Sequence, residues 1–134
     1  MNSNTERQPP QESSAKSLYY EPLSQENIGY VRHYNLNNLD NTQLTDIDTA
    51  IKEATLYMRY GGEAIVDATS IGIARDPVGL LRVSHATGLH IIMGSSFYVD
   101  EAHPKNIANR SENDITEEIV RDITEGVGPH RVKS

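Results

Sequence analysis

The side chains best suited to metal-assisted chemistry here are histidines, and their spacing is unfavourable for a shared site. The five histidines stand at positions 33, 85, 90, 103 and 130. A zinc centre needs three or four ligands that converge at about 2 Å from the ion. His85 and His90 are close in sequence, but the first falls in a predicted helix and the second opens a predicted strand. We therefore predict no metal ligand set within this chain.

Covalent catalysis by a cysteine or a serine is not indicated by the sequence either. There is no cysteine, which excludes a thiol nucleophile, a disulfide and cysteine-ligated zinc. Serines are present, but none stands in a Gly-x-Ser-x-Gly elbow. Gly72 and Gly94 are interpreted as turn glycines, because their surroundings lack the spacing of a phosphate-binding loop. The acidic residues between Glu112 and Glu125 follow a predicted helix and are interpreted as its solvated face.

Charge and hydropathy limit the partners of this chain. Its net charge is −7 and its pI is near 5.1, which argues against a nucleic-acid surface, because phosphate binding needs a basic patch. No apolar run approaches the roughly 18 residues of a membrane span. The polar N-terminus lacks the apolar centre of a secretory signal. We expect a cytoplasmic protein that binds neither nucleic acid nor membrane.

The elements that must position any chemistry lie between Ala64 and Pro104. This stretch predicts a strand, a helix and a second strand, placed at 63–68, 76–88 and 89–93. Such a series is typical of a right-handed parallel βαβ unit. The first strand is apolar throughout, as in strands covered on both faces, apart from Asp67. In parallel folds the chemistry lies where strands end, so we expect function in the loops 69–76 and 95–104.

Two further helices flank this unit. Apolar residues recur at three- and four-residue steps over 42–60, and Gly61-Gly62 follows as a helix terminator. Ser111 and Asp114 form a variant capping box that predicts a helix closed by Gly126. Two parallel strands leave faces and edges that need cover, so we expect a middle piece of a larger fold.

The N-terminal part carries weaker signals. Residues 1–18 are polar and aperiodic, and we predict a disordered leader ahead of an ordered segment 19–134. Between Leu18 and Asn41 the sequence is rich in turn residues. We expect a loop there, with at most one helical turn near residues 24–31.

Four segments carry a resemblance to a known family: GGEAIVDATS, IGIARDP, ATGLHIIMGSSFYV and RSENDITEEIVRDITEGV. They resemble the phosphotriesterase-like family of the amidohydrolase superfamily, over roughly Pro22 to Lys133. The resemblance implies an α/β fold, a fragment of a (β/α)8 TIM barrel comprising about strands 2 and 3 with their flanking helices. It also implies that the full-length protein holds a binuclear metal centre, commonly zinc. That centre would hydrolyse ester, lactone, amide or phosphotriester bonds of a small-molecule substrate.

The departures from the family pattern concern the metal centre. The family's His-x-His motif precedes the matched region, and no His-x-His occurs in this chain. Its remaining ligands belong to barrel strands 4, 5, 6 and 8. We therefore expect no zinc bound to this chain alone and no hydrolytic activity. Two alternatives remain open: a non-catalytic binding or assembly module that self-associates through exposed strand edges, and an incomplete gene model.

Five residues are candidates for supporting roles at the site. By resemblance, Tyr98 matches an aromatic that lines the substrate pocket, with Phe97 beside it; alternatively Tyr98 only packs the loop. His103 lies in the same loop. Asp67 could face a barrel interior and orient a ligand, or it could be a structural carboxylate held by Arg75 or by backbone amides. Arg75 itself is interpreted first as a brace of its loop.

Overall fold

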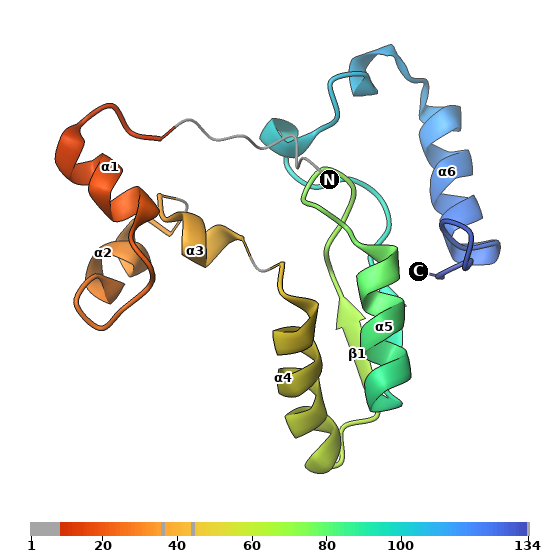
Figure 1. The fold of residues 1–134 in the computed structure, drawn as a ribbon. Coiled ribbons are helices and arrows are strands. Elements are labelled where there is room, and N and C mark those ends of the chain that lie inside the picture. Colours follow the sequence, from red (N-terminus) through yellow and green to blue (C-terminus); the bar gives the residue numbers. More distant parts are fainter. Residues whose placement is uncertain (1–8, 36, 44, 134) are drawn as a thin grey trace. The chain divides into compact units, whose positions relative to one another are not determined.

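The structure, a computed structural model, describes residues 9–35, 37–43 and 45–133. These residues divide into two compact units, one ending at Asp46 and one beginning at Ile47. Each unit is described by itself, and Figure 1 labels helices α1 to α6 and strand β1. Among the described residues, no helix combines the length and the apolarity that crossing a bilayer requires.

The first unit consists of three short helices tied together by one buried asparagine. The helices are α1 (Ser13–Tyr20), α2 (Ile28–His33) and α3 (Leu39–Thr42). Asn38 is fully buried, and its amide nitrogen donates to the carbonyl oxygens of Leu18 and Glu21 at 2.9 and 2.8 Å. Its amide oxygen accepts from the backbone N–H of Asn41 and so caps α3.

The structure differs from the sequence prediction at the start of this unit. A disordered leader was predicted through residue 18, whereas α1 begins at Ser13; residues 1–8 lie outside the described part. The predicted loop after Leu18 likewise contains α2 and α3. The reason is long-range: Tyr19 is buried and the Leu18 carbonyl is held by Asn38, twenty residues further on. Local polarity gives no sign of such a partner.

The second unit contains the predicted βαβ series and both flanking helices. Its elements are α4 (Ile47–Arg59), β1 (Ala64–Asp67), α5 (Pro77–Thr87), β2 (His90–Met93), two 3₁₀ turns, η1 (Asp100–Ala102) and η2 (Ile107–Asn109), and α6 (Glu112–Thr124). β1 and β2 pair in parallel, from Ala64 opposite His90 to Asp67 opposite Met93. The parallel prediction is confirmed. The helix predicted from residue 42 begins at Ile47, and Leu44 lies outside the described residues.

Local end signals act as the sequence predicts. The Asp76 carboxylate accepts from the Gly79 N–H at 3.0 Å, with Pro77 at the first helical position of α5. Gly88 ends α5 in the left-handed conformation, at φ 76°. Each interaction spans only a few residues, so sequence alone suffices to place it.

The two faces of the sheet differ sharply in cover. Met93 is 1% exposed and shares its face with Ile91, which lines a shallow groove with Leu80 and Leu81 of α5. On the other face, Val66 and Ile92 pair in register and are 69% and 47% exposed. The sequence predicts a first strand covered on both faces; among the described residues, helices cover one face only.

The segments beyond the strands continue the parallel arrangement. Ile71 forms an isolated parallel bridge with Phe97, and its N–H donates to the Ser96 carbonyl at 3.0 Å. Gly72, at φ 97°, brings its backbone against the Ala102 carbonyl. The Met93 N–H donates to the Lys133 carbonyl at 3.2 Å. The loops that follow β1 and β2 are thus packed against each other.

Candidate functional site

The loop after β2 brings together three of the residues singled out from the sequence. The Phe97 ring meets the His103 ring edge-on, with centroids 6.1 Å apart, and Arg110 lies 5.8 Å from the Phe97 centroid. Tyr98, in contrast to Phe97, is 59% exposed to solvent. Phe97 therefore packs within the loop, while the Tyr98 side chain is exposed.

His103 braces the loop. Its Nε2 lies 3.0 Å from the Tyr98 carbonyl oxygen, and because a carbonyl only accepts, the nitrogen donates. Its Nδ1 lies 3.5 Å from an Asp100 carboxylate oxygen. Both ring nitrogens are thus engaged inside the loop. The structure places His103 against the Tyr98 backbone, and its role at a substrate site stays a prediction.

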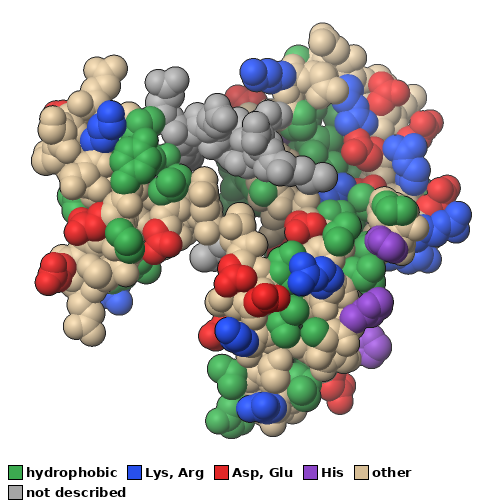
Figure 2. Space-filling model, in the orientation of Figure 1, with side chains coloured by type: hydrophobic (Ala, Val, Ile, Leu, Met, Phe, Trp, Pro, Cys, Tyr) green, Lys and Arg blue, Asp and Glu red, His purple; other side chains and the backbone are tan. Residues whose placement is uncertain are grey.

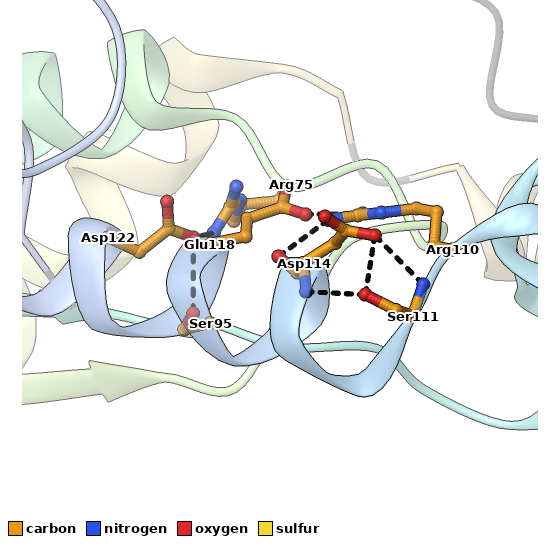
Figure 3. A network of polar contacts seen from close by, with 7 residues as sticks. All are labelled: Arg75, Ser95, Arg110, Ser111, Asp114, Glu118 and Asp122. Atoms are coloured by element: carbon orange, nitrogen blue, oxygen red, sulfur yellow. Dashed lines mark hydrogen bonds and ion pairs between the residues drawn. The ribbon is translucent and has the colours of Figure 1, made fainter.

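A buried polar network joins the loops after both strands to α6 (Figure 3). Arg75 Nη1 donates to Asp122 Oδ2 at 2.6 Å and to the Gly94 carbonyl at 3.1 Å. Ser95 Oγ donates to the same Asp122 oxygen at 3.1 Å. Arg75 thus ties its loop to the end of β2 and to α6, through a partner, Asp122, that the sequence had not suggested.

Asp122 corrects the interpretation of the acidic helix. It was counted with a solvated face, but it is buried. One signal could have identified it: Asp122 stands seven residues after Ile115 and three after Ile119, on the apolar stripe of α6. A carboxylate at that spacing needs a buried partner, because an unpaired charge in the interior is costly.

A second arginine is held one helical turn earlier on α6. Arg110 pairs with Glu118 and donates from Nη2 to the Asp114 carbonyl at 3.0 Å. Glu118 and Asp122 are four residues apart, so they lie on one side of the helix. Figure 3 shows the two carboxylates and the two arginines along α6. On the face drawn in Figure 2, acidic and basic side chains are interspersed over this part of the molecule.

The N-terminus of α6 carries the predicted capping box. The Ser111 hydroxyl accepts from the Asp114 N–H, and the Asp114 carboxylate accepts from the Ser111 hydroxyl and N–H at 2.7 and 2.9 Å. These hydrogen bonds, the hydroxyl first, lower the pKa of the Asp114 carboxyl below its usual 3.8, and Arg110 adds to the effect.

We expect the capping box to make α6 acid-sensitive. The folded-state pKa of Asp114 is depressed, so its stabilising contribution is present above about pH 4 and is lost as the pH falls through the lowered value. Circular dichroism at 222 nm between pH 5 and pH 2 measures this loss. Asp114→Asn should remove part of the acid dependence, whereas Glu112→Gln, in the same turn, should not. Identical acid profiles for Asp114→Asn and the wild type would contradict the assignment.

Asp67 is held by its own turn. Its Oδ1 accepts from the Thr69 hydroxyl at 2.7 Å and from the Thr69 N–H at 3.3 Å. The register places it opposite Met93, on the face that the helices cover. Its structural interpretation is the one that this geometry favours, with Thr69 rather than Arg75 as the partner.

No metal centre is assembled within the described ranges. No three histidine, aspartate or glutamate side chains converge in the part of the chain that the structure describes. Its residues therefore do not fit a binuclear centre. One buried hydroxyl, Ser70 Oγ, has no hydrogen-bond partner among the described residues.

Comparison with known families covers almost the whole chain. A model of the phosphotriesterase family matches residues 7–134. The chain belongs to the phosphotriesterase family. Its match begins in the segment predicted as a leader, in keeping with the helix found there.

Several relatives within the phosphotriesterase family are hydrolases by name. The N-acetyltaurine hydrolases of Dictyostelium discoideum and Homo sapiens are each 34% identical over 119 residues. The matches cover 85% and 88% of this chain, and 32% and 34% of those proteins. The chain spans about a third of the length of the relatives it matches.

Comparison with solved structures identifies the fold. A resiniferatoxin-binding protein from Rhodobacter sphaeroides superposes with a TM-score of 0.84 and 37% identity, over 94% of this chain and 35% of that one. The phosphotriesterase homology protein of Escherichia coli superposes at 0.68 with 24% identity, over 75% of this chain and 34% of that one, and so indicates the fold alone. The chain is part of a phosphotriesterase-like TIM barrel.

Barrel geometry explains the uneven sheet. The helices of a TIM barrel cover the outside of its strands, and branched side chains fill the interior. The exposed face with Val66 and Ile92 therefore corresponds to the barrel interior. Asp67 lies on the opposite, helix-covered face, so its predicted interior placement is not what the register gives.

Proposed function

We propose that this chain supplies two consecutive strand–helix segments of a metal-dependent hydrolase barrel, and that its β2 loop forms one wall of the substrate pocket. The supporting observation is the position of Tyr98, exposed just beyond the carboxyl end of β2. In TIM-barrel enzymes the active site lies at that end of the strands. Tyr98 is the residue we assign to substrate contact, and Phe97 holds the loop beneath it.

The substrate class follows from the family. Its members act on ester, lactone, amide or phosphotriester bonds, and the relatives at 34% identity named N-acetyltaurine hydrolases favour an amide bond to a small acid. The family's zinc would supply an activated water. Because the described residues contain no fitting ligand set, we derive no catalytic step for this chain. We propose that the chain alone neither holds binuclear zinc nor hydrolyses these bonds.

A graft tests this proposal. Residues 47–133 replace the matching segment of human N-acetyltaurine hydrolase, and hydrolysis of N-acetyltaurine is measured with zinc present. We expect the graft to be active and the isolated chain to show no turnover above background. In the graft, Tyr98→Ala should raise KM by about tenfold, the loss of roughly 1.4 kcal/mol of aromatic contact.

A matched tyrosine serves as the control. Tyr60, just beyond α4, is 91% exposed, and Tyr60→Ala should leave KM unchanged. Equal effects of the two substitutions would remove Tyr98 from the pocket. Turnover by the isolated chain would refute the proposal that this chain alone is inactive and needs the rest of the barrel for hydrolysis.

An assembly module is the second candidate, and one observation favours it. The apolar pair Val66 and Ile92 is exposed on one sheet face, beside an edge of β1 that pairs with no other strand in the described part of the chain. Such surfaces favour pairing with a further chain. Light scattering distinguishes the cases: a defined oligomer with a cooperative melt indicates a module that self-associates, and a monomer excludes it.

A further inference from the structure

We propose that Asp122 and Arg75 are positioning residues for the substrate loop 95–103: they fix its first residues to α6 and thereby set the place of Tyr98. The inference rests on the proposed function, because it gives Tyr98 its significance. Neither side chain is assigned a contact with substrate. Their role is exerted through the backbone of the loop.

The geometry converges on a single carboxylate oxygen. Asp122 Oδ2 accepts from Arg75, in the loop after β1, and from the Ser95 hydroxyl, in the loop after β2. The same guanidinium nitrogen also donates to the Gly94 carbonyl, at the point where β2 leads into the loop. Two loops and one helix, which are not consecutive in sequence, therefore meet at this carboxylate.

Burial makes the contact between Arg75 and Asp122 sensitive to the loss of either charge. The Arg75 and Asp122 side chains are 10% and 7% exposed. In such surroundings water does not replace a lost partner, so removing one charge leaves the other without compensation. A surface ion pair such as Arg82 with Asp48 lacks this property, because solvent screens it.

A second contact holds the loop a few residues further on. Phe97 lies under Arg110, which pairs with Glu118 on the same side of α6 as Asp122. Between the two contacts, Ser96 has φ 71°, in the left-handed region that a residue with a side chain rarely adopts. Such a conformation persists only where its surroundings impose it. The loop is thus fixed on both sides of a strained residue, directly before Tyr98.

The competing explanation is that the ion pair serves stability alone. The two explanations differ in one respect. A buried pair can often be exchanged for apolar residues of similar volume without loss of stability. If the ion pair serves stability alone, such an exchange would restore what the pair contributes. It would not restore the hydrogen bonds to Ser95 and Gly94.

The test measures amide hydrogen exchange in the full 134-residue chain, as the ratio of exchange in 95–103 to exchange in the β1–β2 pair. An opening of the whole unit raises exchange in the strand pair at least as much as in the loop, so global destabilisation alone does not raise this ratio. We expect Asp122→Asn to raise it by about tenfold, because the hydrogen bonds from Arg75 and Ser95 then lose their charged acceptor. Ser95→Ala, a milder change, should raise it less. Glu117→Gln, an exposed carboxylate on the same helix, should leave it unchanged.

The double variant Arg75→Met with Asp122→Leu separates the explanations. We expect its melting temperature to return towards that of the wild type while the exchange ratio stays raised. In the graft, the same variant should raise KM more than it lowers kcat. Two results would overturn the positioning role. One is a double variant whose exchange ratio and melting temperature both return to the wild-type values. The other is an unchanged exchange ratio in Asp122→Asn. An inactive wild-type graft would refute the proposed function instead, and the exchange ratios would still decide the positioning.

Discussion

Gly72→Ala is expected to destabilise the second unit by about 3 kcal/mol or more. Gly72 has φ 97°, which L residues rarely adopt, and a Cβ atom there would overlap the backbone carbonyl of Ala102. Backbone strain and overlap add, because the obstructing atom belongs to the main chain and has no other rotamer. Urea unfolding followed by circular dichroism gives the change in free energy of unfolding.

Gly88→Ala is the matched control. Gly88 also has a positive φ, 76°, but nothing lies within 4 Å of the position that its Cβ would take. We expect it to cost only the conformational strain, about 1 kcal/mol. A Gly72→Ala variant no less stable than Gly88→Ala would show that the loops after β1 and β2 are not packed as described.

Met93→Ala should cost about 2–5 kcal/mol in free energy of unfolding, because it empties a buried site on the covered face of the sheet. Met93 is almost wholly buried, at 1% exposure. Ile92→Ala, one residue earlier on the same strand, is the comparison. Its side chain is half-exposed on the open face, so we expect a loss well under half as large.

Equal losses for these two variants would mean that both faces of the sheet are covered in solution. That result would point to a partner on the open face. It would therefore favour the assembly module, and light scattering at the same protein concentration would identify the partner as a second copy.

The parts of the fold that the sequence predicts are those governed by neighbours along the chain. The Asp76 cap of α5, the left-handed Gly88 and the Ser111 capping box each involve residues within a single turn. The parallel pairing followed from the length of the crossover, and it is confirmed. These features depend on backbone geometry that few residue types provide, so the residue type itself carries the information.

The parts that sequence reasoning missed depend on distant partners. Helix α1 is tied through Asn38, and Asp122 is buried because Arg75 and Ser95 reach it from other elements. A polar residue gives no local sign of whether its partner is water or a side chain far along the chain. For the site, family resemblance named Tyr98 and Phe97 together, and only the structure distinguishes them: Phe97 packs against Arg110, whereas Tyr98 is exposed.

The separation of Arg75 from Asp122 also bears on how the chain reaches its native state. The two residues are 47 positions apart, whereas β1, α5 and β2 are immediate neighbours in sequence. Closing a longer segment costs more entropy, and a nascent chain emerges from its N-terminal end. We therefore expect the strand pair and its crossover helix to form during synthesis while the guanidinium is still hydrated. Docking of α6 then becomes the late step, in which that guanidinium gives up its water for a carboxylate.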